Sequence, residues 1–304
     1  MTYSIPSDIA TVDVDGNGKI DRLYVGDMGG RMWRFDIQDT NPSSWTGKII
    51  FKSNDDGATT NLRRMFYPPD VTLEVGYEMV LVGTGDREHP NDKIVVNRLY
   101  AVKDKNLTDT PSGRPYIESD LYDATYNLLQ AGTSEQKTAA LSALNAAKGW
   151  LIQLLPSTSG EKSLASPVVF FGVAYFTTFA PSPDAPEPGT DPCYVGEGTA
   201  RLYELGYKTA TAMFNLDLTN DISGTTYGAS DRSQVIGTAI PSGVIITVIQ
   251  NRAVAYAGMG GGVIGSRDDS CPSPPCQPPC GQGGPEICFK NQKVLVPVNW
   301  KIVF

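Results

Sequence analysis

Four stretches of this 304-residue chain share one pattern, in which a short apolar strand, a turn with glycine and a second strand follow one another. The stretches are 22–37, 78–104, 166–217 and 253–265, and RLYVGDMGGRMWRFDI is the clearest of them. Glycine allows the positive φ of tight turns, and branched and aromatic residues suit a pleated strand. The repeat predicts an all-β fold of the β-propeller type, with an irregular β-sandwich as the alternative.

Two segments depart from this pattern. Residues 119–149 read as two short helices, and Thr133 with Gln136 predicts a capping box at the start of the second. Residues 266–290 are rich in Cys, Pro and Gly and hold too few apolar side chains to fold by burial. We therefore expect a single propeller-type domain over 1–304, with a helical insertion at 119–149 and a loop at 266–290.

The cysteines indicate disulfides rather than zinc. Four of the five lie in the loop, and these candidates are Cys271, Cys276, Cys280 and Cys288, with Cys193 as the fifth. Zinc sites usually contain C-x2-C pairs, which this loop lacks. Three pairings of the four are open, and Cys193 is left over unless it joins one of them. Disulfides imply an oxidising, extracytoplasmic compartment.

Composition limits the partners. The net charge of -8 disfavours nucleic acid and suits divalent cations. No apolar run approaches the roughly 18 residues that span a bilayer. The first residues lack the features of a signal peptide, so we expect this chain to be cut from a longer one. The single histidine, His89, lies in a polar, turn-like segment, so we expect it to be a solvated loop residue without a catalytic role.

The stretch DVDGNGKID predicts a calcium loop. Asp13, Asp15, Asn17 and Asp21 occupy positions 1, 3, 5 and 9, and Lys19 at position 7 supplies its backbone carbonyl. Calcium takes six to eight oxygens, and carboxylates at alternate positions of a short loop can surround it. Three carboxylates so close together repel one another without a cation. The alternative is an acidic hairpin that holds no ion.

The loop departs from an EF-hand after position 9. Position 12, a bidentate glutamate in that motif, is Tyr24, which lies in an apolar strand, and no helices flank the loop. Asp27, in the turn after that strand, is not counted among the ligands. We expect Ca²⁺ rather than Mg²⁺, because Mg²⁺ keeps several waters in a strict octahedron. The sequence thus predicts a single calcium-binding loop joined to a strand, without the helix pair that opens and closes in a calcium sensor.

The sequence resembles a known family. The calcium loop with its following strands, then MVLVGTGD and NRLYAVKD, resembles the C-terminal propeller domain of type IV pilus tip-associated proteins of PilY/PilC type. The stretch 148–181, Cys193 with GEGTARLYEL, and the final VNWKIVF also match that family's pattern. The resemblance covers most of the chain, whereas 119–149 and 271–288 look like local additions.

The resemblance implies a modified, quinoprotein-like propeller, partial or irregular because only about four units are visible. It implies a non-enzymatic, calcium-binding protein at the pilus tip and cell surface or in the periplasm. Minor pilins of the tip complex and a host or abiotic surface are the implied partners. The implied roles are pilus (fimbrium) biogenesis, control of extension and retraction in twitching motility, and adhesion.

Two other classes of protein share the predicted propeller. An integrin-like adhesion propeller carries similar calcium loops, but usually in several blades, whereas this loop occurs once. A quinoprotein-type dehydrogenase shares the propeller, but such enzymes commonly place adjacent cysteines beside the quinone, and this chain has no adjacent pair. We therefore expect no enzymatic activity.

Overall fold

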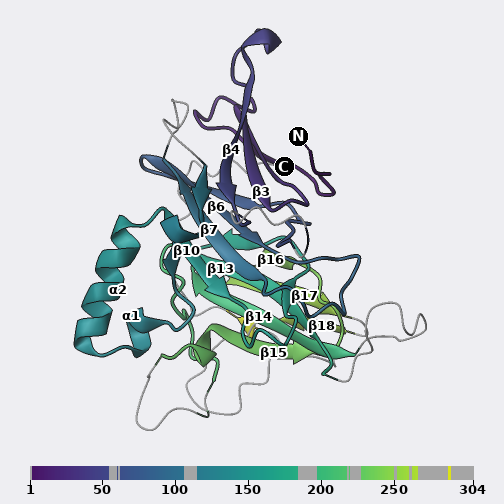
Figure 1. The fold of residues 1–304 in the computed structure, drawn as a ribbon, viewed down its shortest axis with the longest axis vertical. Coiled ribbons are helices and arrows are strands. Elements are labelled where there is room, and N and C mark those ends of the chain that lie inside the picture. Colours follow the sequence, from purple (N-terminus) through teal and green to yellow (C-terminus); the bar gives the residue numbers. More distant parts are fainter. Residues whose placement is uncertain are drawn as a thin grey trace.

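The computed structural model describes residues 2–54, 60, 62–105, 115–183, 197–217, 219, 227–249, 252–259, 262–265 and 287–288. Within these ranges the protein is mostly β, and its strands gather in four sheets, here named A to D in chain order (Figure 1). The predicted all-β character is confirmed. Neighbouring strands pair antiparallel, except that β8 and β9 run parallel to β4 and β10.

The first two sheets are built from the N-terminal half of the chain. Sheet A contains β1 (Ala10–Val12), β2 (Arg22–Gly26), β3 (Arg31–Asp36), β4 (Thr46–Lys52) and β8 (Tyr116–Ile117). Sheet B contains β5 (Asp70–Glu74), β6 (Tyr77–Gly83), β7 (Arg98–Asp104), β9 (Tyr122–Asp123) and β10 (Gly149–Gln153). The hairpin between β3 and β4 carries η1 (Pro42–Ser44) and projects from the top of Figure 1.

The other two sheets follow in order. Sheet C contains β11 (Lys162–Ser163), β12 (Val168–Phe170), β13 (Val173–Pro181), β14 (Gly198–Gly206) and β15 (Ser233–Gly237). Sheet D contains β16 (Val244–Ile249), β17 (Arg252–Met259), β18 (Gly262–Gly265) and β19 (Ile287–Cys288). Each of the four repeats in the sequence falls in a different sheet, so the repeated pattern does correspond to separate sheets.

Consecutive sheets pack face to face through three apolar cores. Sheets A and B share a core that includes Tyr24, Phe51 and Tyr100. Sheets B and C share a second, around Trp150, Phe176 and Leu205, and sheets C and D share a third, around Tyr175, Leu202 and Ala255. Sheets B and C are therefore covered on both faces. This explains why β6 and β13 are buried at nearly every residue rather than at alternate residues.

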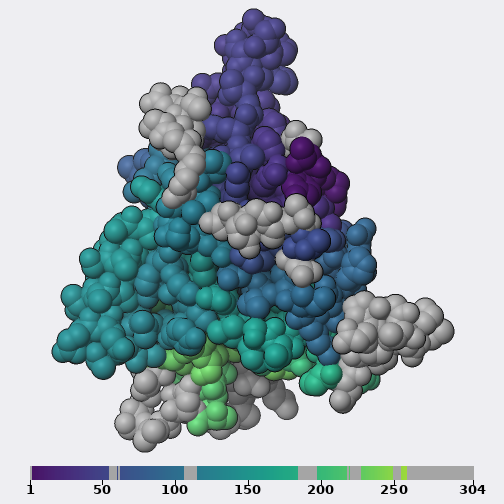
Figure 2. Space-filling view, in the orientation of Figure 1, coloured from purple at the N-terminus to yellow at the C-terminus, as the bar shows by residue number. Residues whose placement is uncertain are grey.

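Two helices flank sheet B (Figure 1) and form the lower-left side of the surface in Figure 2. They are α1 (Leu128–Ala131) and α2 (Ser134–Ala146). Thr133 and Gln136 form the predicted capping box, which is confirmed. Ala140 and Leu144 are the buried residues of α2, and Leu144 belongs to the core between sheets B and C.

The first predicted helix is shorter than the sequence indicates. Residues 118–120 form the 3-10 helix η2 (Glu118–Asp120), and Tyr122–Asp123 form β9. Trp150 and Leu151 of β10 pair with these two residues in parallel. Pairing with a neighbouring strand thus overrides the local helical pattern at this point.

The cysteine prediction lies outside the described part of the chain. Cys193, Cys271, Cys276 and Cys280 are not described, and Cys288 is described only as backbone in β19. The segment 266–290 is likewise described only at 287–288. Among the described residues, no helix has both the length and the apolar character needed to cross a membrane.

Candidate metal site

The predicted calcium loop is the connection between β1 and β2. These strands pair antiparallel, with Val12 opposite Arg22, so the nine residues 13–21 between them form the end of a hairpin. Asp21 extends the ladder, since its N–H donates to the carbonyl of Val12 at 2.8 Å and its own carbonyl accepts the N–H of Ile37 at 2.8 Å. The start and end of the loop are therefore fixed by strand pairing in sheet A.

Three carboxylates of this loop converge. Oxygen atoms of Asp13, Asp15 and Asp21 all lie within 4.8 Å of one another. Oxygens that share one calcium ion lie about 2.3–2.6 Å from it, and therefore no more than about 5 Å from each other. The three carboxylates thus fit a common hard cation.

Backbone amides fold the loop around the Asp13 carboxylate. Its Oδ1 accepts the N–H of Gly16 at 2.7 Å and that of Asn17 at 3.1 Å, and its Oδ2 accepts that of Gly18 at 2.7 Å. Gly16 and Gly18 have φ of 74° and 86°, which disfavours any residue with a Cβ. The glycines allow the tight turn that brings the carboxylates together.

The remaining predicted ligands have different surroundings. Asp21 is buried, and its Oδ2 accepts the N–H of Val14 at 2.7 Å. The amide Nδ2 of Asn17 donates to Asp15 at 2.8 Å, and its Oδ1 accepts the N–H of Lys19 at 2.8 Å. Lys19 is exposed. The hairpin thus places the five predicted ligands in one compact loop.

Asp27 has a structural role at the other end of β2. It is fully buried, and its carboxylate accepts the N–H groups of Gly29 at 2.9 Å and Arg31 at 3.0 Å and the indole N–H of Trp33 at 2.9 Å. These bonds hold the Gly-Asp-x-Gly-Gly turn between β2 and β3. Asp27 therefore stabilises the turn between β2 and β3, at the opposite end of β2 from the predicted calcium loop.

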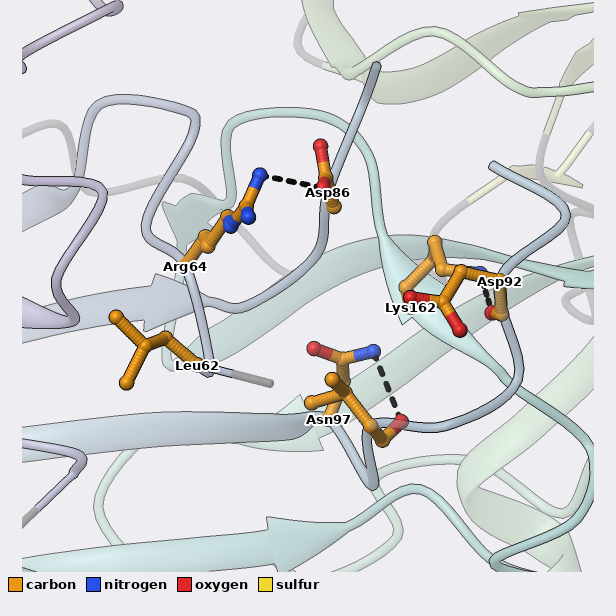
Figure 3. A pocket seen from close by; sticks show the side chains of 7 residues that line it. Leu62, Arg64, Asp86, Asp92, Asn97 and Lys162 are labelled. Carbon is orange, nitrogen blue, oxygen red and sulfur yellow. Dashed lines mark hydrogen bonds and ion pairs between the residues drawn. The ribbon is translucent and has the colours of Figure 1, made fainter. Parts of the chain in front are cut away.

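A second group of acidic side chains lies beside a small cavity. The cavity of about 50 Å³ is lined by Leu62, Arg64, Asp86, Asp92, Val95, Asn97 and Lys162 (Figure 3). Asp86 accepts from Arg64 at 2.6 Å and contacts the exposed ring of His89 at 2.9 Å. With Arg64 on Asp86, the group of Asp86, Glu88 and His89 is a poorer cation site than the loop. The cavity has room for about one or two waters.

The Gly-Glu-Lys stretch at 160–162 forms buried hydrogen bonds with sheet C and with the segment 90–92. Glu161 accepts the hydroxyl of Thr178 at 2.6 Å and that of Tyr203 at 3.0 Å. Lys162 is buried and donates from Nζ to the carbonyls of Pro90 at 2.6 Å and Asp92 at 2.7 Å. Burial lowers the pKa of Lys162 to about 8 and raises the pKa of Glu161. Both residues are therefore buried and stabilise the structure through these hydrogen bonds.

The sequence prediction missed an ionic network between sheets A and B. Arg22 donates from Nη1 to Glu78 of β6, and Arg34 donates from Nη1 to Asp104 of β7 at 2.7 Å. All four residues are buried. One signal was available, since Arg22 begins an apolar strand and Arg34 lies between the aromatic residues Trp33 and Phe35, where a buried charge needs a partner. The identity of those partners depends on how the two sheets pack.

Comparisons with known proteins agree with the resemblance. No family model matches the chain. A curated relative, the type IV pilus biogenesis factor PilY1 homolog of Xylella fastidiosa (strain Temecula1 / ATCC 700964), is 26% identical over 200 residues, which is 60% of this chain. The crystal structure of the Pseudomonas aeruginosa PilY1 C-terminal domain matches 84% of this chain with a TM-score of 0.57 and 13% identity. The resemblance to PilY/PilC-type proteins is confirmed.

The extent of these matches is partial. The aligned region spans 13% of the Xylella protein, and this chain covers 59% of the solved PilY1 domain. At 13% identity the solved PilY1 structure supports the fold alone. An endo-arabinase from Bacteroides thetaiotaomicron also aligns, with a TM-score of 0.35 and 10% identity, a similarity too low to indicate a shared fold or activity.

Proposed function

We propose that this chain is a calcium-binding, non-enzymatic part of a type IV pilus protein that acts in pilus biogenesis at the pilus tip. The observation that carries the proposal is the convergence of Asp13, Asp15 and Asp21 within 4.8 Å, in a chain with PilY1-like sequence and fold.

Electrostatics favours a cation in the loop. Three carboxylates within 4.8 Å repel one another, and a divalent ion relieves that repulsion while its oxygen ligands replace water. Asp13, Asp15, Asn17, Asp21 and the carbonyl of Lys19 would hold the ion. The loop joins β1 and β2, so the ion would stabilise the pairing of these two strands in sheet A.

Calorimetry tests calcium binding. The unaltered chain is expected to bind about one Ca²⁺, and Asp21→Ala is expected to abolish binding while circular dichroism stays unchanged. Asp39→Ala, a change at an exposed aspartate beside η1, serves as the matched control and is expected to bind normally. Equal affinity in Asp21→Ala and the unaltered chain would refute the site. A stoichiometry of three or more would favour the integrin-like alternative.

The packing of the sheets supports a propeller-like arrangement. Sheets A to D follow one another along the chain, and each packs on the next through its own core. Blades of a propeller have this relationship to their neighbours. We therefore include a partial or irregular propeller in the proposal, with 1–304 as one domain.

The pilus role predicts location and partners. The proposed partners are minor pilins of the tip complex and a surface to which the pilus adheres. Pili sheared from cells that make this protein are expected to contain it, and shearing of cells without minor pilins is expected to release none. Recovery only from the cytoplasm would contradict the proposal.

The same location predicts disulfides among the cysteines. Mass spectrometry without reduction is expected to find disulfide-linked peptides from 271–288, because pilus proteins mature in an oxidising compartment. Free thiols at every cysteine would remove this support for an extracytoplasmic location. A dye-linked dehydrogenase assay with added quinone is expected to give no activity.

A further inference from the structure

The last residue of the calcium loop is followed at once by a residue that contacts the next sheet. Successive side chains in a strand point to opposite faces. The carboxylate of Asp21 turns into the loop, where it accepts the N–H of Val14. The guanidinium of Arg22 turns toward sheet B, where it donates to Glu78, and its Nε also donates to Asp36 at 2.9 Å.

This contact is part of a buried network that fixes sheet A against sheet B. The hydroxyl of Tyr24 donates to Glu78 and lies 2.9 Å from Asp104, which also accepts from Arg34 at 2.7 Å. Side chains of both charge signs face one another here, and the charged atoms are hidden from water. A buried charge that loses its partner is costly, so small shifts of sheet A relative to sheet B are resisted.

A second contact joins the loop to the same interface. Val14 stands between the ligands Asp13 and Asp15, and its side chain packs against the core shared by sheets A and B. Val71 of β5 in sheet B packs against that core as well. The N–H of Val14 meanwhile donates to Asp21 at 2.7 Å. The loop is thus attached to the interface at its second residue and at the residue after its end.

We infer that Val14, Arg22 and Glu78 are positioning residues that couple calcium binding in the loop to the contact between sheets A and B. The inference rests on the proposed calcium binding. Without an ion, the repulsion among the three carboxylates loosens the loop and, with it, the placement of Val14 and Arg22. An ion favours the tight arrangement, and by linkage a change on sheet B alters the affinity for the ion.

Glu78→Gln tests the coupling from the side that holds no ligand. The substitution keeps the shape of the side chain and removes the charge opposite Arg22. Calorimetry is expected to show a calcium affinity at least about fivefold lower, and the rise in Tm on adding calcium is expected to shrink. Glu161→Gln, at another buried carboxylate, directly before β11 of sheet C, is the matched control and is expected to keep the affinity.

Hydrogen exchange of the unaltered chain gives a second, independent readout. Calcium is expected to slow exchange of amides in β6 and β7, which contain Glu78 and Asp104 but no ligand. This readout does not require the variant to fold. A merely structural Glu78 would lower Tm equally with and without calcium and leave the affinity unchanged.

The outcomes separate the two proposals. If the unaltered chain binds no calcium, the proposed function fails, and this inference fails with it. If it binds calcium, but Glu78→Gln binds within twofold of it and β6 and β7 gain no protection, the coupling alone is wrong.

Discussion

The carboxylate of Asp13 accepts the amide N–H of Gly18 at 2.7 Å, within the loop that we propose binds calcium. Gly18 holds a φ of 86° there, and a Cβ added to it would meet no atom within 4 Å. Space is therefore no obstacle to a larger residue at this position. The backbone conformation alone requires glycine, and the carboxylate of Asp13 depends on that conformation for one of its bonds.

Gly18→Ala is expected to weaken calcium binding by roughly 5- to 30-fold. A residue with a Cβ pays about 1–2 kcal/mol in this left-handed conformation, and the ion-free loop can relax to escape that strain. Calorimetry measures the change. Gly172→Ala is the control, because Gly172 has a φ of 85° and equal space but lies in the turn between β12 and β13, far along the chain. An unchanged affinity in Gly18→Ala would show that calcium does not need this loop conformation.

Lys162 is expected to make stability rise with pH over a defined window. Its pKa is lowered to about 8 by burial, from an ordinary value of 10.5, so between these values the unfolded chain binds more protons than the folded one. Stability therefore increases with pH across the window, by at most about 1.4 kcal/mol per pH unit. The neutral amine keeps two N–H groups for the carbonyls of Pro90 and Asp92.

Urea unfolding at pH 7.5 to 9.5 checks this expectation against Lys162→Met. The stability of the unaltered chain relative to Lys162→Met is expected to increase with pH, because the variant has no group to titrate there. Lys137→Met, at an exposed position of α2, is the control and is expected to give a difference that does not vary with pH. A constant difference for Lys162→Met as well would contradict the lowered pKa.

Trp150→Phe is expected to destabilise the fold by about 2–4 kcal/mol. Trp150 is fully buried in the core between sheets B and C, and its indole N–H donates to the carbonyl of Tyr207 at 2.8 Å. Phenylalanine leaves a cavity and an acceptor without its donor. Trp45→Phe is the control, since Trp45 makes a similar bond to Asp39 but is 47% exposed, and it is expected to cost less than about 1 kcal/mol. Equal losses for the two variants would contradict the assignment of Trp150 to the core.

The local features of this fold could be predicted from the sequence. Each strand repeat, such as 22–37, contains its own glycine turn and pairs with itself, so the pattern already contains the contacts. The loop from Asp13 to Asp21 is local in the same way, because nine consecutive residues between paired strands bring the carboxylates together. The capping box is local too, because Thr133 and Gln136 are only three positions apart.

Non-local features could not be predicted in this way. Arg22 and Glu78 are 56 residues apart, and their pairing depends on how sheets A and B pack. Tyr122–Asp123 read as helix because the strand with which they pair begins 26 residues later, at Gly149. The burial of Lys162 likewise depends on the carbonyls of Pro90 and Asp92, which lie 72 and 70 residues away along the chain.

The proposed function depends on one calcium ion, held by the loop between β1 and β2. A crystal structure of the protein grown with calcium chloride, with anomalous scattering recorded at a long wavelength, tests it most directly. One strong peak is expected among Asp13, Asp15 and Asp21, with oxygens at about 2.3–2.6 Å from the ion. A well-ordered loop with no peak between these carboxylates, at a calcium concentration that saturates binding in solution, would contradict it.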